Sequence, residues 1–207
     1  CYPEEITEEL IQTIKEEPKI CHYLDLPIQH ASDDVLKRMG RRTSKEELIH
    51  IISRIREEIP DITLRTTLIT GFPGESKEQH EELMDFVDEM AFGRLGVFTY
   101  SAEDGTPAAQ MPDQVEESVK EARRAELMEL QQEIAFDQAE QMIGREVLVM
   151  IEGKVADENA YVGRTYKDAP NVDGLIFVNT DTELLSGDFA KVRVTGACEY
   201  DLIGELM

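Results

Sequence analysis

Two segments of the sequence place polar or Gly-rich residues directly after apolar, strand-like runs. Residues 24–32 read Leu-Asp-Leu-Pro-Ile-Gln-His-Ala-Ser, and residues 69–75 read Ile-Thr-Gly-Phe-Pro-Gly-Glu. Each segment leads into an amphipathic, helix-like stretch. Enzymes of the α/β class present ligand-binding atoms where strands end in this way. The two segments therefore predict one rim of a binding or active site.

The second segment offers the strongest candidates for contacting a ligand. Gly71 and Gly74 would allow close approach of the backbone, and Pro73 would stiffen the turn. Glu75 has two interpretations. Its carboxylate could hydrogen-bond a ribose hydroxyl or an amine of the cofactor, or its negative charge could stabilise the N-terminus of the following helix through the helix dipole. The whole turn is therefore predicted to bind a cofactor: Gly71, Phe72, Pro73, Gly74 and Glu75.

Further candidates come from the same rim. Gln29 can both donate and accept hydrogen bonds, which suits a cofactor or a substrate carboxylate. Arg65 lies mid-strand, where an unpaired charge is costly, so we expect it to pair with a carboxylate of the cofactor or of the protein. A lone histidine such as His30 is more often structural than functional. Tyr100 and Ser101 end a further strand-like run. The other histidines, at positions 22, 50 and 80, lack metal-ligand spacing, and no metal site is predicted.

The elements that must hold this rim alternate between strand and helix. Strand-like runs cover residues 23–28, 62–70 and 95–100, and helical spacing covers residues 7–15, 44–59 and 76–90. Ser44 and Glu47 have the spacing of a capping box, and Pro60 ends that helix. Three β/α units cannot close a barrel. The sheet is therefore either open, or the chain is the C-terminal part of a longer (β/α) barrel protein, which the start at Cys1 favours.

From residue 144 onward the pattern becomes all-β. A long helix is expected to begin at Asp113, to carry Val119 and Leu127 on its apolar side and to stop at Gly144. Five short strands then follow, and they suit a small closed barrel. We predict them at residues 147–151, 160–165, 174–179, 189–195 and 198–203. The predicted domains are residues 1–143 and 144–207.

Composition limits the class of protein and its partners. Among 207 residues, 41% are hydrophobic and the net charge is −23. Such a charge repels phosphate backbones and favours a basic partner. The sequence shows neither a membrane-span pattern nor a signal-peptide pattern, which predicts a cytoplasmic protein. Its three cysteines, Cys1, Cys21 and Cys198, are too widely spaced for a Cys-x-x-Cys metal site.

Taken together, several motifs resemble one known family. They are Tyr-Leu-Asp-Leu-Pro-Ile-Gln-His-Ala-Ser at 23–32, Leu-Arg-Thr-Thr at 64–67, Gly-Phe-Pro-Gly-Glu at 71–75, Tyr-Ser at 100–101 and Gly-Thr-Pro-Ala at 105–108. This set closely resembles the methylthiotransferase family of radical S-adenosylmethionine (radical SAM) enzymes. The resemblance implies a partial radical SAM (β/α) barrel of the TIM-like type, followed by the small five-stranded antiparallel barrel called TRAM.

Two features favour one branch of that family. Gln-His-Ala-Ser at residues 29–32 resembles the RimO type, which modifies an aspartate of small-subunit ribosomal protein S-twelve, whereas the transfer-RNA branch tends to carry Gln-Ser-Gly-Ser there. Residues 144–207 contain six basic and twelve acidic residues, a net charge of −6. An acidic barrel suits a basic protein better than transfer RNA. We therefore expect the barrel to bind S-twelve and not to bind transfer RNA directly.

The resemblance also implies a mechanism and cofactors. A reduced [4Fe-4S] cluster would cleave S-adenosylmethionine to a radical that takes hydrogen from the aspartate β-carbon. A second cluster would carry the methylated sulfur, and an electron donor such as flavodoxin would supply electrons. Family members bind these clusters through Cys-x-x-x-Cys-x-x-Cys and three further cysteines, and neither set is present here. This chain alone is therefore expected to be inactive.

Two other functions remain open at this point. One is a methylthiotransferase of the branch that modifies adenosine in transfer RNA. The other is a non-catalytic module whose acidic barrel binds a basic protein, with the α/β part acting only as a scaffold.

Overall fold

The protein forms two compact units in the computed structural model, which describes residues 1–207. Unit 1 contains residues 1–20 and 24–134, and unit 2 contains residues 21–23 and 135–207. The division into domains 1–143 and 144–207 stays a prediction.

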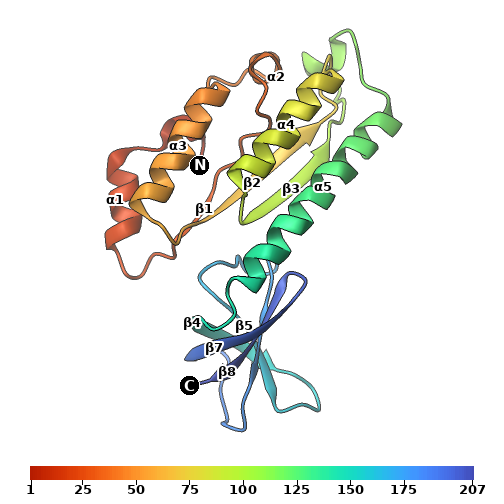
Figure 1. Cartoon of the computed structure of the whole chain (residues 1–207). Helices are drawn as coiled ribbons and strands as arrows, with labels where there is room; N and C mark the ends of the chain where they lie inside the picture. Colours follow the sequence, from red (N-terminus) through yellow and green to blue (C-terminus); the bar gives the residue numbers. More distant parts are fainter. The chain divides into compact units, whose positions relative to one another are not determined.

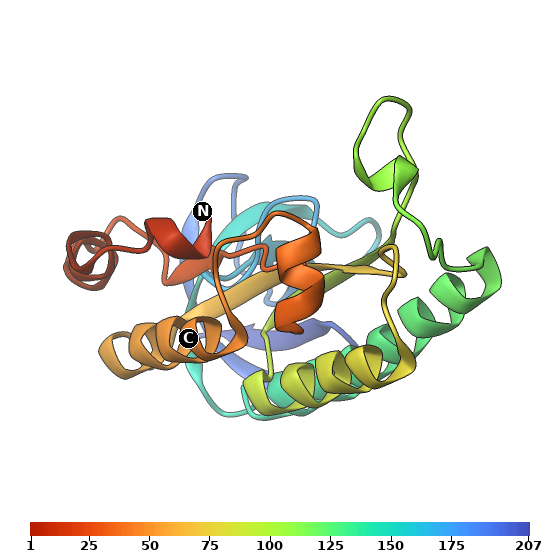
Figure 2. The same ribbon diagram turned by 90° about the horizontal axis from the view of Figure 1, so that it is seen from above.

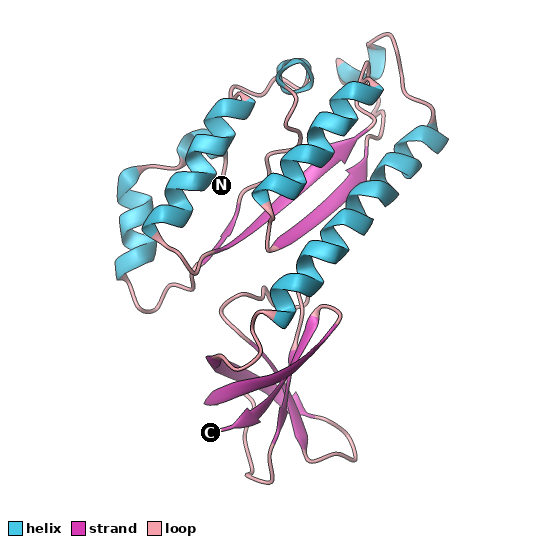
Figure 3. Cartoon of the chain, viewed as in Figure 1, coloured by secondary structure: helices cyan, strands magenta, loops and turns pink.

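Unit 1 is an α/β unit built on a three-stranded sheet with the strand order β1-β2-β3 (Figures 1 and 3). Its α/β class agrees with the strand and helix alternation in the sequence. The strands are β1 (Tyr23–Asp25), β2 (Thr63–Thr70) and β3 (Arg94–Thr99). The helices are η1 (Pro3–Glu5), α1 (Glu8–Glu16), α2 (Asp33–Arg38), α3 (Lys45–Glu58), α4 (Lys77–Met90), η2 (Ala108–Gln110) and α5 (Glu117–Glu140), which continues into unit 2.

Local capping fixes where the helices of unit 1 begin. The hydroxyl of Ser44 accepts from the Glu47 N–H at 3.3 Å, while the Glu47 carboxylate accepts from the Ser44 N–H at 2.7 Å. This confirms the predicted capping box at the start of α3. Ser76 caps α4 in the same way together with Gln79. Both helices therefore start where the sequence predicted.

The start of α5 differs from the prediction. The helix begins at Glu117 and not at Asp113. Asp113 has a left-handed backbone (φ 59°), and its carbonyl accepts from the Gly74 N–H at 2.8 Å. Asp113 is therefore part of the connection before the helix. Val119 is 39% exposed, so its predicted place on the apolar side was wrong, whereas Leu127 is fully buried.

The two faces of the sheet in unit 1 have different environments. Along β2, Leu64, Thr66, Leu68 and Thr70 are buried, and helices α3, α4 and α5 lie along one face of the sheet (Figure 2). Of the alternate residues of β2, Arg65, Thr67 and Ile69 are only partly buried, whereas Thr63 at the start of the strand is buried. On β3, Phe98 pairs with Ile69 and is 62% exposed. One face thus forms the core, and the other remains accessible within this unit.

Unit 2 is a closed five-stranded barrel with the strand order β4-β5-β6-β8-β7. The strands are β4 (Glu146–Lys154), β5 (Ala160–Arg164), β6 (Ile176–Asn179), β7 (Phe189–Cys198) and β8 (Asp201–Leu206). The predicted small closed barrel is thus confirmed. Its core is apolar and includes Val149, Ile151, Ile176, Val178 and Val192.

Two details of the barrel differ from the prediction. It is not wholly antiparallel, because β6 and β8 pair in parallel. Cys198 ends β7 and does not begin β8, since Glu199 has a left-handed backbone (φ 55°) and turns the chain before Asp201.

No helix in the structure is both long and apolar enough to cross a lipid bilayer. The three cysteines are free and exposed. No group of three or more His, Cys, Asp or Glu side chains is arranged to hold a metal ion.

Candidate functional site

The carboxyl ends of β2 and β3 bring most of the predicted rim residues together. Thr70 pairs with Thr99, so Gly71 and Tyr100 leave the sheet side by side. On the other side of β2, the backbone of Gln29 forms a parallel bridge with Leu68. The Gln29 N–H donates to the Thr67 carbonyl, and the Gln29 carbonyl accepts from the Ile69 N–H. Three segments distant in sequence thus meet at one edge of the sheet, which we call the carboxyl edge.

The chain leaves β2 through a tight turn. The Glu75 N–H donates to the Phe72 carbonyl at 2.9 Å, which closes a turn with Pro73 and Gly74 at its centre. Proline followed by a residue with positive φ is the signature of a type II turn, and Gly74 has φ 76°. Gly71 also has a left-handed backbone, φ 71°. The structure therefore has the turn that the sequence predicted here, with Pro73 at its centre.

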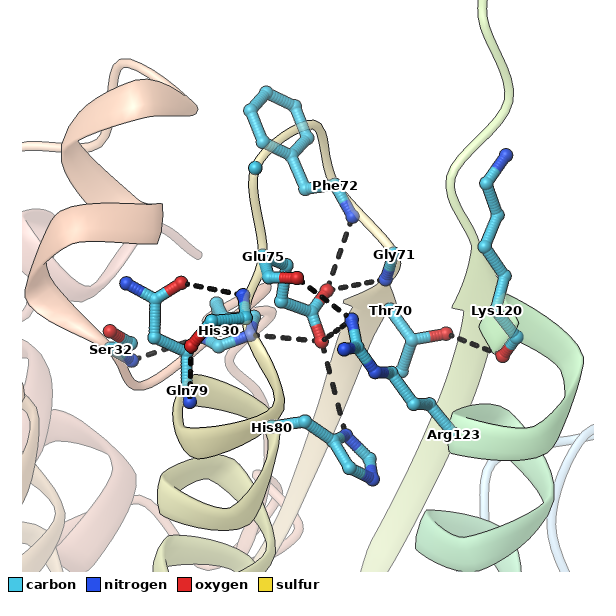
Figure 4. A network of polar contacts seen from close by, with 12 residues as sticks. His30, Ser32, Thr70, Gly71, Phe72, Glu75, Gln79, His80, Lys120 and Arg123 are labelled. Atoms are coloured by element: carbon cyan, nitrogen blue, oxygen red, sulfur yellow. Dashed lines mark hydrogen bonds and ion pairs between the residues drawn. The ribbon is translucent and has the colours of Figure 1, made fainter. Parts of the chain in front are cut away.

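The Glu75 carboxylate organises this turn from the inside (Figure 4). Its side chain is fully buried, and its Oε2 atom accepts hydrogen bonds from the N–H groups of Gly71 and Phe72. The other oxygen, Oε1, lies 3.2 Å from Arg123 Nη1. That guanidinium also donates to the Glu75 carbonyl at 3.1 Å. Glu75 thus ties the turn to α5.

Two buried histidines face the same carboxylate oxygen. His30 Nε2 lies 4.0 Å and His80 Nδ1 lies 3.9 Å from Glu75 Oε1. Because His30 Nδ1 accepts from the Ser32 N–H at 3.0 Å, we assign the His30 proton to Nε2, toward Glu75. His80 Nε2 lies 2.7 Å from a Glu126 carboxylate oxygen. The two imidazoles therefore extend the network from the first segment of the rim to α5.

The network sets the charge of Glu75. Burial by itself raises the pKa of this carboxyl group, but hydrogen bonding and charge from His30, the positive charge of Arg123 and the Gly71 N–H outweigh it. The net effect is a pKa below the ordinary value of 4.5. Glu75 is therefore held as a carboxylate inside the protein.

Side chains of the protein itself fill the space beside the two glycines. A Cβ atom on Gly71 would lie 2.2 Å from Lys120 Cγ, and one on Gly74 would lie 3.4 Å from the guanidinium of Arg38. Lys120 Nζ in turn donates to the Tyr100 carbonyl at 2.9 Å. On their Cβ side, the glycines thus allow close internal packing and not the approach of a ligand.

Arg65 lies on the accessible face of the sheet. Its Nε atom is 3.9 Å from Asp25 Oδ2 on the neighbouring strand, and the side chains are 23% and 52% exposed. This carboxylate belongs to the protein, which is one of the two partners that the sequence suggested.

Two features of the carboxyl edge are costly unless they serve a purpose. Gln29 has a left-handed backbone (φ 72°), which is unfavourable for a residue with a side chain. The hydroxyl group of Tyr100 is buried without a hydrogen-bond partner. The Tyr100 ring lies in a small apolar cluster, where its centroid is 5.2 Å from the centroid of the Phe72 ring. Ser101, by contrast, is exposed and donates to Glu103. Strain and an unsatisfied polar group are typical of binding sites.

Sequence reasoning missed the part of the site that α5 and α2 contribute. Lys120 and Arg123 are buried polar residues of α5, and Arg38 of α2 donates to the Gly74 carbonyl at 3.1 Å. A signal was present in the spacing, because Lys120, Arg123, Leu127 and Gln131 recur every three or four residues. His80, which lacks metal-ligand spacing in the sequence, is buried in the network.

Comparisons with known proteins agree with this architecture. The sequence profile of the radical SAM superfamily matches residues 2–87, and that of the TRAM domain matches residues 143–207. A Lachnoclostridium phytofermentans protein, ribosomal protein uS12 methylthiotransferase RimO, is 65% identical over 99% of this chain and 46% of that protein. Along its whole length, the chain is similar to radical SAM methylthiotransferases.

Two further proteins similar to this chain carry the same name. The Desulfitobacterium hafniense protein is 49% identical over 100% of this chain and 46% of its own length. The protein of Clostridium botulinum strain Loch Maree is 52% identical over 99% of this chain and 45% of its own length. The chain thus spans about half the length of the curated relatives that it matches.

Proposed function

We propose that the protein to which this chain belongs is a radical SAM methylthiotransferase that adds a methylthio group to the β-carbon of an aspartate in ribosomal protein uS12. The observation that supports this proposal is the identity of 49–65% over essentially the whole chain to proteins named for that activity. The net charge of −6 on residues 144–207 favours a basic protein over RNA as the macromolecular substrate.

The proposed cofactors are S-adenosylmethionine and two [4Fe-4S] clusters. The residues of this chain do not fit a cluster, because its three cysteines are exposed and far apart in sequence and no metal-binding group of side chains is formed. The proposal therefore assigns the cluster thiolates to the part of the protein outside this chain.

The carboxyl edge fits S-adenosylmethionine better. Gln29 offers an amide at a strained backbone position, and the Tyr100 hydroxyl is a buried polar group without a partner. In the proposal, Gln29, Arg65 and the turn Gly71-Phe72-Pro73-Gly74-Glu75 hold and orient this cofactor, which supplies the radical chemistry when bound. Glu75 acts by fixing the turn, because its own carboxylate is fully buried.

The proposed partners follow from the charge and the family. The acidic barrel binds basic uS12, an electron donor such as flavodoxin supplies electrons, and the barrel does not bind transfer RNA directly. The cytoplasmic location stays a prediction.

A product assay with the full-length protein tests the proposal. The protein is reconstituted anaerobically with iron and sulfide and incubated with S-adenosylmethionine, a reductant and either uS12 or transfer RNA. We expect mass spectrometry to show a methylthio increment on one aspartate of uS12. Methylthiolated adenosine instead would assign the protein to the other branch, and no product in either reaction would favour a non-catalytic module.

The same assay tests the carboxyl edge. Gln29→Gly deletes the amide but suits the left-handed backbone, so we expect a folded protein with at least about tenfold lower activity. Ala91→Gly is the matched control, because Ala91 also has a positive φ (43°) and lies at the end of α4, away from this edge. Equal activity of the two variants would show that the Gln29 side chain is not needed at the site.

A further inference from the structure

The outer surface of the barrel carries an apolar patch formed by β4, β7 and the turn before β7. Leu148 is 54%, Leu185 66% and Phe189 67% exposed. Met150 is partly exposed and pairs directly with Phe189, while Leu148 pairs with the next outward residue of β7, Lys191. We call Leu148, Met150, Leu185 and Phe189 the β4–β7 patch. Exposed apolar clusters of this kind mark sites of interaction.

Paired charges lie on β4 and on the strands that flank it, β7 and β5. Glu146 accepts from Arg193 at 3.0 Å, and Glu152 accepts from Arg164 at 2.9 Å. Two of the cations near the patch, Arg193 and Arg164, are therefore already neutralised, whereas Lys191 has no ion-pair partner.

An acidic hollow of about 280 Å³ adjoins the turn of the patch. Asp181, Glu183 and Leu184 line it on one side, and Lys154, Asn159 and Tyr161 line it on the other. Leu184, which lines the hollow, directly precedes Leu185 of the patch. The Asn159 amide donates to the Asp181 carboxylate at 2.9 Å and so joins the β4–β5 loop to the β6–β7 loop. An apolar surface thus leads into a hollow with more carboxylates than cations.

We propose that the β4–β7 patch and this hollow bind an extended segment of a basic protein. Lysine and arginine side chains have long apolar stems that can cover Leu148 and Phe189, while their charged heads reach Asp181 and Glu183. A guanidinium can also stack on the exposed ring of Phe189. The inference rests on the proposed function, because it is uS12 that supplies the basic segment.

Single-stranded RNA is the competing occupant of the patch. Exposed aromatic rings next to cations can stack bases, and Phe189 lies two residues from Lys191. The adjoining hollow opposes this, because its carboxylates and the net charge of −6 on residues 144–207 repel phosphates. The charges therefore favour the basic protein.

Binding measurements on this 207-residue chain test the surface. Fluorescence anisotropy gives the Kd for labelled, purified uS12 and for a labelled single-stranded RNA. We expect Phe189→Ser to weaken uS12 binding at least about tenfold, as loss of an aromatic anchor does, and Glu183→Gln to weaken it a few fold. Val172→Ser is the matched control, since Val172 is also an exposed apolar residue (58%) but lies on the β5–β6 loop.

The outcomes separate this surface from the proposed activity. Equal uS12 binding by wild type, Phe189→Ser and Val172→Ser would contradict a role of the β4–β7 patch in binding. Methylthiolation of uS12 by the full-length protein, without uS12 binding by this chain, would contradict it as well. RNA binding that depends on Phe189, in place of uS12 binding, would also overturn it. Loss of uS12 binding in Phe189→Ser, with no methylthiolation of uS12 by the full-length protein, would support the surface and reject the proposed function.

Discussion

Unit 1 and unit 2 place their charged groups in opposite ways. In unit 1, Glu75, Arg123 and two histidines form a buried polar network that fixes the turn after β2. In unit 2, the barrel core is apolar and pairs such as Glu146–Arg193 lie on the outer surface of the barrel. The buried Asp168 accepts hydrogen bonds from Thr165 within the connection between β5 and β6. A buried charge without its partner is far more costly than an exposed one. The conformation of the candidate site therefore depends on charge, whereas that of the barrel depends on packing.

Removing the centre of the buried network gives the largest expected effect. Glu75→Ala leaves Arg123 without its carboxylate and two backbone N–H groups without an acceptor, which should cost about 3–5 kcal/mol of stability. Hydrogen exchange followed by mass spectrometry reads each unit separately. We expect faster exchange in peptides of unit 1 and unchanged exchange in the barrel strands. Unchanged protection around residues 71–80 would show that the network does not hold the turn.

A methyl group at Gly71 should have the next largest effect. Gly71→Ala combines a left-handed backbone with a contact to Lys120 Cγ, and we expect a loss of about 1–3 kcal/mol in thermal or urea unfolding. Gly105→Ala is the matched control, because its φ is 80° and no heavy atom lies within 4 Å of the added Cβ. The difference between the two variants isolates the packing against Lys120. Equal losses would attribute the whole effect to backbone strain.

Acid should weaken unit 1 through Glu75. Because the pKa of this carboxyl is lower in the folded state than its ordinary value of 4.5, its contribution to stability is complete above that value. The contribution is then lost as the pH falls through the folded-state pKa. We expect hydrogen-exchange protection of the turn to fall with acid in wild type and to depend less on pH in Glu75→Gln. The same acid dependence in both proteins would contradict this role.

The smallest effect is expected on the surface of the barrel. Glu146→Gln removes an ion pair whose two side chains are more than half exposed, so the change in stability should not exceed about 0.5 kcal/mol. Urea unfolding of this variant provides the comparison with Glu75→Ala. A loss of similar size in both would break the contrast between the two units.

Local patterns predicted the parts of the fold that depend on neighbouring residues. The capping box at Ser44 and the turn at Pro73 and Gly74 involve residues within four positions of each other, and the structure has both. The start of α5 could not be found in this way, because the Asp113 carbonyl binds the N–H of Gly74, 39 residues earlier. The parallel pairing of β6 with β8 is likewise set by contacts distant in sequence.

The candidate site shows the same limit. Its position at the carboxyl edge could be predicted from the strands that precede its residues in the sequence. The side chains that contact Glu75 could not be predicted in this way. Arg123 lies 48 residues after Glu75 in the sequence, and no local motif links them. The role of the seven predicted cofactor-binding residues therefore stays a prediction, although the structure places Gln29 and the turn 71–75 at one edge.

The order of strands in the barrel also bears on how the chain is made. β8 lies between β6 and β7, so the barrel has two unpaired strand edges until residues 201–206 are added. During synthesis, β4 to β7 must therefore wait with exposed N–H and C=O groups until the ribosome has released β8. Nascent chains stalled before this point should be good substrates for chaperones and proteases.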